Sequence, residues 1–298
     1  MFVISGSSNQ QLANELAEEL DLKVIPVKID TFPNGEKKIQ IQQDVHGQNV
    51  ILLQSFSTPA DEYIMEFLLL TDALERMGAR HINAVLPWMG YSLQDKVFRS
   101  GEPLSAKVVA DLVSQSYVKR VLLLDLHNQS IPGFFSVPTR QLSALSLFAQ
   151  YCSASYQPEE IIVASPDFGG LKRAREFANT LGVDLVNIDK QRDLKTGAVT
   201  VTGIHGSVEG RTVILFEDCI VAGGTVIETA KILKEKGAKQ VHFLATHGIF
   251  VKDSQERIQA SDVDSVVITN SIEHDHLAAK ISKISVAPLF AESLRQWM

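Results

Sequence analysis

Residues 213–233 read VILFEDCIVAGGTVIETAKIL, and they contain a strand, a loop and a helix start in immediate succession. The opening run of β-branched and apolar residues is typical of a buried strand, and it ends in two acids, Glu217 and Asp218. A Gly-Gly turn follows, and the capping-box spacing of Thr225 and Glu228 predicts a helix that begins there. Free backbone N–H groups at a helix N-terminus bind phosphate. The stretch predicts a sugar-phosphate site with acids placed for ribose hydroxyls or a metal; an ordinary capped turn is the alternative.

The size and composition of the chain are those of a globular protein with two domains. Its 298 residues exceed the usual length of one domain, and 45% hydrophobic with 21% charged residues is the ordinary balance of such proteins. The net charge is −7 and Lys and Arg do not cluster, so nucleic acid is not expected as a partner. The longest apolar runs, such as 121–124, are too short to span a bilayer and the N-terminus has no signal pattern, so no membrane partner is expected.

The two cysteines, Cys152 and Cys219, favour a reducing cytoplasm. They have neither the spacing of metal ligands nor enough partners for a disulfide framework. Cys219 lies within the 213–233 stretch, and we interpret it as a packing residue rather than a nucleophile.

The chain contains two copies of one unit. GQNVIL at 47–52 recurs as GRTVIL at 210–215, an offset of 163 residues, and GARHI at 78–82 recurs as GAKQV at 237–241, an offset of 159. Either match alone is weak, because Gly-Ala is common between a helix and a strand. Two matches in the same order indicate a tandem duplication.

Alternating strand-like and helix-like segments predict an α/β protein. Apolar runs separated by helices are typical of parallel strands that are buried on both faces. We predict two tandem doubly wound parallel-sheet domains, 1–145 and 146–298, with the extreme C-terminus allowed to pack back on the first. Strands are expected near 1–4, 50–54, 81–87, 119–125, 160–164, 184–188, 212–216, 240–245 and 264–269, and helices near 9–20, 60–77, 103–116, 140–152, 168–181 and 225–236.

Chemically useful side chains follow several of the expected strands. His127, Asp167, and the pair Lys190 and Arg192 come after three of them, and the two acids of the 213–233 stretch follow a fourth. Ligands bind beyond the carboxyl ends of parallel strands, and these residues are the magnesium ligands, cations and diol acceptors that phosphoryl transfer needs. Singly, each also has a structural interpretation: a buried histidine, a helix cap, and a solvated loop.

Seven motifs occur in order along nearly the whole chain: Phe32 to Glu36, Gly90 to Lys96, Gly101 to Lys107, Asp125 to His127 with Gly133 to Phe135, Ser165 to Gly170, Lys190 to Arg192 and Thr246 to Gly248. Together they resemble the ribose-phosphate pyrophosphokinases, which are the phosphoribosyl pyrophosphate synthetases. The resemblance implies two domains of phosphoribosyltransferase type, the first on the nucleotide side and the second on the ribose-phosphate side. It also implies transfer of the β,γ-diphosphate of Mg-ATP to the C1 hydroxyl of ribose 5-phosphate.

The same resemblance assigns residue roles. The 32–36 motif would reach the nucleotide of a neighbouring subunit, which makes the protein a homo-oligomer with a shared ATP site. Lys190 and Arg192 would be catalytic and would lie on a mobile loop. The remaining assignments are Phe32, Asn34, Glu36, Gln94 and Asp95 for ATP, His127 and Asp167 for Mg²⁺, Glu217 and Asp218 for the ribose diol, and Val221, Ala222, Gly223, Gly224 and Thr225 for the phosphate.

The departures from the family pattern lie near the substrates. Leu93 stands where the family has Arg, Glu217 where it has Asp, and Val221 and Ala222 where it has hydroxyl side chains. Three interpretations follow: a synthetase that uses ribose 5-phosphate, the same transfer to a larger ribosyl phosphate such as ADP-ribose, or a non-catalytic regulatory relative. The survival of His127 and of the other charged candidates favours an enzyme.

Overall fold

The computed structural model describes residues 1–166, 169–192 and 199–297, and the chain divides into two compact units. Unit 1 comprises Met1–Ser143, Asn270–Glu273 and Ser285–Met298, and unit 2 comprises Ala144–Thr269 and His274–Ile284. The chain thus passes from unit 1 to unit 2 two residues before the expected boundary. Two segments from the expected second domain belong to unit 1, the last of them at the extreme C-terminus.

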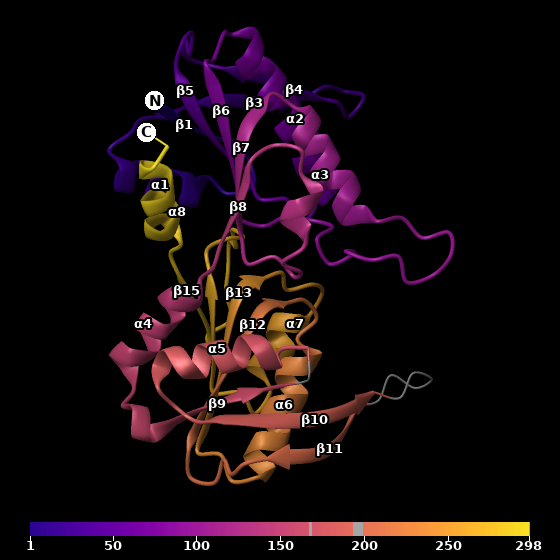
Figure 1. The fold of residues 1–298 in the computed structure, drawn as a ribbon. Helices are drawn as coiled ribbons and strands as arrows, with labels where there is room; N and C mark the ends of the chain where they lie inside the picture. Colours follow the sequence, from indigo (N-terminus) through magenta and orange to yellow (C-terminus); the bar gives the residue numbers. More distant parts are fainter. Residues whose placement is uncertain (167–168, 193–198, 298) are drawn as a thin grey trace. The chain divides into compact units, whose positions relative to one another are not determined.

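Unit 1 is built on a six-stranded sheet in which all neighbouring strands are parallel (Figure 1). Helices cover both faces, α2 and α3 on one and α1 and α8 on the other, so the central strands are buried. A separate antiparallel hairpin, β3–β4, follows the second strand. The elements are β1 (Phe2–Ser5), α1 (Gln10–Leu20), β2 (Val24–Ile25), β3 (Val27–Thr31), β4 (Lys37–Ile41), β5 (Asn49–Leu53), α2 (Ala60–Arg76), β6 (His81–Leu86), α3 (Ser105–Gln115), β7 (Val118–Leu124), β8 (Thr139–Leu142) and α8 (Ala287–Arg295).

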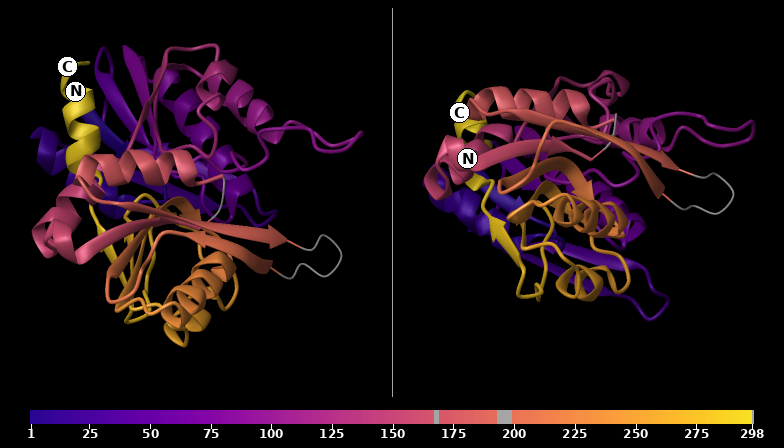
Figure 2. Two further views of the ribbon diagram at one scale, coloured as in Figure 1. Left: turned by 60° about the horizontal axis from the view of Figure 1, so that its bottom comes forward. Right: turned by 90° about the horizontal axis from the view of Figure 1, so that it is seen from below.

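Unit 2 is built on a seven-stranded sheet that is parallel except at its β10–β11 edge. Helix α5, with α4 packed beside it, covers one face, and α6 and α7 cover the other (Figure 2). The elements are α4 (Leu145–Ser155), β9 (Ile161–Ser165), α5 (Leu171–Leu181), β10 (Leu185–Arg192), β11 (Val199–His205), β12 (Thr212–Ile220), α6 (Gly224–Glu235), β13 (Gln240–Gly248), α7 (Ser254–Gln259), β14 (Ser265–Thr269) and β15 (Ile281–Ile284).

The two sheets have the same topology. The strand order is β2-β1-β5-β6-β7-β8 in unit 1 and, after the edge strand β11, β10-β9-β12-β13-β14-β15 in unit 2. Each unit also inserts an antiparallel hairpin at its second strand. The predicted duplication and the two doubly wound parallel-sheet domains are therefore confirmed. In each sheet the chain order reverses once, between β1 and β5 and between β9 and β12, and such switch points are where open α/β sheets bind ligands.

Aromatic packing fixes the central strand of unit 2. The Phe216 ring of β12 lies 5.3 Å from the Phe148 ring of α4 and 4.8 Å from the Phe177 ring of α5, measured between centroids. All three side chains are fully buried. Large buried rings contribute strongly to core stability, so this cluster holds β12 in the register that presents the residues after Phe216 at the switch point.

Several local expectations were wrong. Strand β12 continues to Ile220, and β10 continues to Arg192 because it pairs with β11, so Lys190 and Arg192 lie in a strand rather than on a loop. Helix α6 begins at Gly224, with Gly223 as its N-cap. In the part of the chain that the structure describes, no side chain caps this helix, so the expected capping box at Thr225 does not form.

Other elements were missed or misassigned in the sequence. Residues 140–142, expected to be helical, belong to the edge strand β8 (Thr139–Leu142), and the short or polar strands β2, β3, β4, β11 and β15 gave no strong apolar run. Helices α7 and α8 were also missed. Among the described residues, no helix is both long and apolar enough to cross a bilayer.

Candidate active site

Two adjacent carboxylates stand at the switch point of unit 2, and one arginine holds both. Arg173, in the first turn of α5, donates from Nη1 to Glu217 Oε2 at 3.0 Å and to Asp218 Oδ1 at 3.2 Å. The Glu217 and Asp218 side chains are 15% and 9% exposed, so both are largely shielded from water. Because two neighbouring carboxylates repel each other, the guanidinium that bonds to both offsets part of that repulsion.

Gly170, the N-cap of α5, makes room for one of these acids. A Cβ atom at Gly170 would lie 2.5 Å from Glu217 Oε1, closer than van der Waals contact permits. The residue at 170 must therefore be glycine for Glu217 to keep its place. The start of α5 and the end of β12 thus form one close-packed arrangement around the acid pair.

The loop after β12 offers backbone donors. Gly223 has a φ of 73°, and it turns the chain directly into α6. The carbonyl oxygens of Ile220 and Val221 accept hydrogen bonds from the N–H groups of Ile249 and Val251, at 2.8 and 3.0 Å, which fixes the loop on its other side. The first N–H groups of any α-helix have no partner within the helix, so the start of α6 suits a phosphate.

The side chains on this loop are small or exposed. Ala222 and Thr225 are exposed and Val221 is half-buried. Thr225 keeps its hydroxyl in the first turn of α6, although it does not cap the helix. All five residues assigned to the phosphate, 221–225, therefore lie together beside the acid pair in unit 2.

In unit 1, two of the residues assigned to ATP, Gln94 and Asp95, lie next to the end of β7. Asp95 accepts a hydrogen bond from Asn128 Nδ2, which joins the 90–96 run to the segment that follows β7. The side chain of Gln94 accepts one from Ser105 Oγ at the start of α3. His127 is exposed in the same segment. The fold thus brings Gln94, Asp95 and His127 to one edge of the unit 1 sheet.

The other residues assigned to ATP form the tip of the β3–β4 hairpin. Residues 32–36 are all exposed, and Phe32 is 45% exposed with Lys38 Nζ 5.7 Å from its ring centroid. Asn34 Oδ1 accepts the Glu36 N–H at 3.2 Å, which shapes the turn. The hairpin presents Phe32, Asn34 and Glu36 to the surroundings of unit 1.

Comparison with known proteins decides the family. Residues 1–116 match the N-terminal domain of ribose phosphate pyrophosphokinase, and residues 194–298 match the phosphoribosyl synthetase-associated domain. The ribose-phosphate pyrophosphokinases of Helicobacter hepaticus and Thermotoga maritima are 42% and 38% identical, and both matches cover 99% of this chain and 94% of the relative. The chain belongs to the ribose-phosphate pyrophosphokinase family.

A solved structure supports the same conclusion. The phosphoribosylpyrophosphate synthetase of Mycobacterium smegmatis is 34% identical and superimposes with a TM-score of 0.91, covering 99% of this chain and 98% of that one. The predicted family, the enzyme type and the two tandem domains of phosphoribosyltransferase type are confirmed.

Within this ribose-phosphate pyrophosphokinase fold, the proposed cations and metal ligands are only partly located. The backbones of Lys190 and Arg192 lie in β10, opposite Val201 and Val199 of β11. Asp167 lies outside the described residues. Among the residues that are described, no three His, Cys, Asp or Glu side chains gather closely enough to hold a metal by themselves.

The thiol beside the acid pair, Cys219, lies in the environment of a packing residue. Burial, followed by the negative charges of Asp218 and Glu217, raises the pKa of the Cys219 thiol. Nucleophilic cysteines react as thiolates and have lowered pKa values. The interpretation of Cys219 as a packing residue is therefore consistent with its environment in this pyrophosphokinase.

Two positioning residues, Arg173 and Asn128, were not identified in the sequence, and neither was the role of Gly170 within the Ser165 to Gly170 motif. Each contacts a predicted site residue from another element. Gly170 is the second glycine of the Gly-Gly pair that follows β9, and Arg173 comes shortly after it. Placing the first turn of α5 beside the end of β12 could have identified both, because β9 and β12 are neighbours in the sheet.

Proposed function

We propose that this protein transfers the β,γ-diphosphate of ATP to the C1 hydroxyl of ribose 5-phosphate and releases AMP. The carrying observation is the unit 2 switch point, where two carboxylates clamped by Arg173 lie beside the start of α6. Carboxylates accept hydrogen bonds from a ribose diol, and the helix start binds the 5-phosphate. The names of the relatives support this substrate.

The proposed reaction is a nucleophilic displacement at the β-phosphorus of ATP. The C1 hydroxyl oxygen forms a bond to the β-phosphorus, the bond between that phosphorus and the α,β-bridging oxygen breaks, and AMP leaves. The hydroxyl proton passes to solvent. Lys190 and Arg192, on the strand two places from β12, stabilise the negative charge that develops on the transferred group.

We further propose Mg²⁺ as the cofactor. It neutralises phosphate charge when bound with ATP, and His127 and Asp167 are its proposed protein ligands. A histidine is a less usual ligand for Mg²⁺ than oxygen, so the assignment of His127 rests on the family resemblance.

ADP-ribose is the second candidate acceptor, and one observation favours it. The phosphate loop carries Val221 and the exposed Ala222 in place of hydroxyl side chains. A diester needs fewer donors than the dianion of a monoester, and it needs room for the group beyond the phosphate. The small side chain of Ala222 leaves that room.

A competition experiment tests both acceptors. The protein receives ribose 5-phosphate and ADP-ribose at equal concentration with Mg-ATP, and AMP and the diphosphorylated product are identified. Phosphoribosyl pyrophosphate as the sole product, with the KM for ribose 5-phosphate unchanged in Ala222→Thr, rules out ADP-ribose. No AMP with either acceptor overturns the proposed reaction.

We also propose a homo-oligomer that acts in a reducing cytoplasm. The 32–36 loop is exposed on unit 1, as a loop that completes a neighbouring subunit's ATP site must be. Both cysteines are free thiols, which suits a reducing compartment. Sedimentation velocity with simultaneous assay tests the assembly, and a fully active monomer would exclude the shared site.

A further inference from the structure

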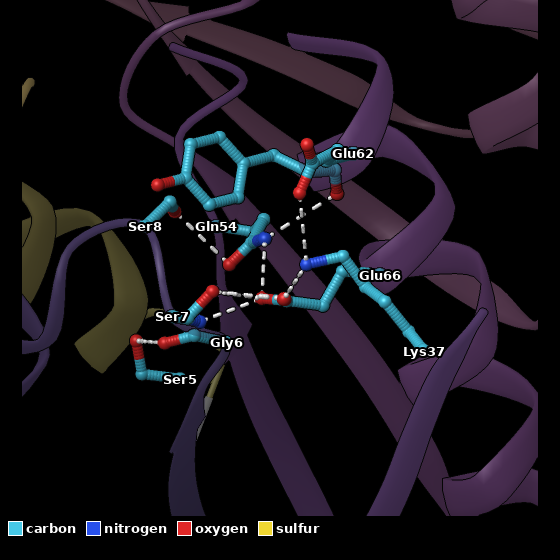
Figure 3. Close-up of polar contacts among 9 residues, drawn as sticks. Ser5, Gly6, Ser7, Ser8, Lys37, Gln54, Glu62 and Glu66 are labelled. Carbon is cyan, nitrogen blue, oxygen red and sulfur yellow. Dashed lines mark hydrogen bonds and ion pairs between the residues drawn. The ribbon is translucent and has the colours of Figure 1, made fainter. Parts of the chain in front are cut away.

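The switch point of unit 1 contains a carboxylate that is completely buried. The Glu66 side chain, on α2, is 0% exposed. It accepts hydrogen bonds from the Ser7 N–H at 2.6 Å, from Ser7 Oγ at 2.8 Å, from Gln54 Nε2 at 3.0 Å and from Lys37 Nζ at 3.0 Å. Figure 3 shows Ser7 and Lys37 on opposite sides of this carboxylate. A buried charge is tolerated only when it is paired and fully hydrogen-bonded, and Glu66 meets both conditions.

The position of Glu66 corresponds to the phosphate loop of unit 2. Helices α2 and α6 end at Arg76 and Glu235, which differ by the same 159 residues as the repeated Gly-Ala turns behind them. By the same offset, Glu66 is the residue equivalent to Thr225, which lies in the first turn of α6. Where unit 2 offers donors to an external anion, unit 1 supplies the anion from its own chain.

The closure of this site is tight. A Cβ atom at Gly6, in the loop after β1, would lie 2.5 Å from Glu66 Oε1 and 2.1 Å from Gln54 Oε1. Ser8 Oγ donates to Gln54 Oε1 at 3.0 Å. The loops after β1 and β5 are thus held together around the Glu66 carboxylate. The donors beside it, on Ser7, Gln54 and Lys37, already bond to it.

Lys37 connects this carboxylate to the 32–36 loop. It is the first residue of β4, it directly follows Glu36, and it pairs with Thr31 across the hairpin. Its side chain is 16% exposed and also lies 3.5 Å from the exposed Glu62. The hairpin belongs to a two-stranded sheet separate from the main one, so side-chain contacts must fix its position.

We propose that Glu66 is an internal anion and that, through Lys37, it positions the 32–36 loop for nucleotide binding. Lys37 and Glu66 are positioning residues, because neither is placed against a substrate. The anchoring of the hairpin stands on the geometry alone, whereas the effect on the nucleotide rests on the proposed function. Without Lys37, the Glu66 charge would remain buried with neutral donors only, and the end of the hairpin next to the 32–36 loop would lose its ionic anchor.

The test compares Lys37→Met, Lys37→Arg and Lys28→Met in the full-length protein. Lys28 is the matched control, because it forms an exposed ion pair with Asp30 on the same hairpin. Hydrogen exchange of residues 27–41 is measured on the free protein by mass spectrometry, and KM and kcat are measured for ATP and ribose 5-phosphate. Glu66→Gln, which keeps the shape of the side chain, provides a second removal of the pair.

In Lys37→Met we expect exchange of 27–41 to accelerate about tenfold and the KM for ATP to rise about tenfold. We expect kcat and the KM for ribose 5-phosphate to stay within about threefold of wild type. Lys37→Arg should restore both properties, and Lys28→Met should change neither. Glu66→Gln should act as Lys37→Met does.

Two outcomes overturn the proposal, and they are distinct. Exchange of 27–41 within about twofold of wild type in both Lys37→Met and Glu66→Gln would refute the anchor. Accelerated exchange with an unchanged KM for ATP would refute the positioning role. If the wild-type protein forms no AMP, the proposed function fails, and the exchange measurement still decides whether Glu66 and Lys37 anchor the hairpin.

Discussion

The segment directly after β5 and the end of β12 occupy equivalent places in two copies of one fold, yet they differ in character. In unit 2, Glu217 is partly exposed and Asp218 is buried, and both lie beside the start of α6. In unit 1, the residues at the offset of 163 are Gln54 and Ser55, both fully buried. Gln54 bonds to Glu66, and Ser55 Oγ donates to the Ser271 carbonyl oxygen at 2.6 Å.

The difference teaches how a duplicated fold can keep one ligand site and close the other. At each switch point a glycine of the first loop lies very close to a carboxylate. Gly170 lies close to Glu217, and Gly6 lies close to Glu66. In unit 2 the carboxylate is left partly open, and in unit 1 every neighbouring donor is used internally. A polar site with all its hydrogen bonds satisfied has no remaining affinity for a ligand and stabilises the fold instead.

The largest effect is expected at β10, the unit 2 strand with the proposed catalytic cations. Lys190→Ala should lower turnover of ATP to AMP on the order of a hundredfold or more, because a positioned cation in a water-excluded site contributes several kcal/mol to the transition state. Steady-state assay measures it, with Lys172→Ala on the exposed face of α5 as the control. Turnover within about threefold of wild type would remove Lys190 from the mechanism.

Substitutions at the equivalent positions Asp218 and Ser55 test this comparison directly. Asp218→Asn should lower kcat/KM for the ribosyl phosphate by about tenfold to a hundredfold, because a hydrogen bond to a charged group contributes about 1.5–3 kcal/mol. Ser55→Ala, at the equivalent place, should leave kcat/KM unchanged and lower the free energy of unfolding by about 1 kcal/mol. Kinetics and urea unfolding separate the two effects. A kinetic defect in Ser55→Ala would contradict the conclusion that the switch point of unit 1 binds no ligand.

Gly170→Ala should have an intermediate effect. The added Cβ displaces Glu217 and should raise the KM for the ribosyl phosphate about tenfold. Gly133→Ala in unit 1, where a Cβ would meet no atom within 4 Å, is the matched control. Equal KM values for the two variants would show that the close approach of Gly170 to Glu217 has no role in binding.

The smallest effect on activity is expected at Cys219. Since its pKa is raised, the thiolate fraction at pH 8 is below that of a free cysteine, and alkylation should be correspondingly slow and should accelerate as pH rises. Mass spectrometry after iodoacetamide treatment measures this, with the urea-unfolded protein as reference. Cys219→Ala should keep turnover within about twofold. Rapid labelling of the folded protein at pH 8 would mean that the thiol is activated.

Burial separates the strands that the sequence predicts correctly from those that it does not. Strands buried on both faces, such as β5, β12 and β13, were recognised because their apolar runs are continuous. The β3–β4 hairpin was missed although it contains the 32–36 motif, since its exposed strands alternate apolar with charged residues. The edge strand β8 was taken for helix, because a four-residue polar strand is defined by its pairing with β7 rather than by its own composition.

The sequence by itself determined the duplication, the parallel α/β class, the family and the acids Glu217 and Asp218, because these follow from local composition, spacing and motif order. Only the tertiary structure decided what those residues touch. Arg173 reaches the acids across 44 and 45 residues of chain, and Ser7 reaches Glu66 across 59. Such contacts arise when parallel strands that are distant in sequence become neighbours at a switch point. That placement is set by packing of the whole sheet, so no local pattern records it.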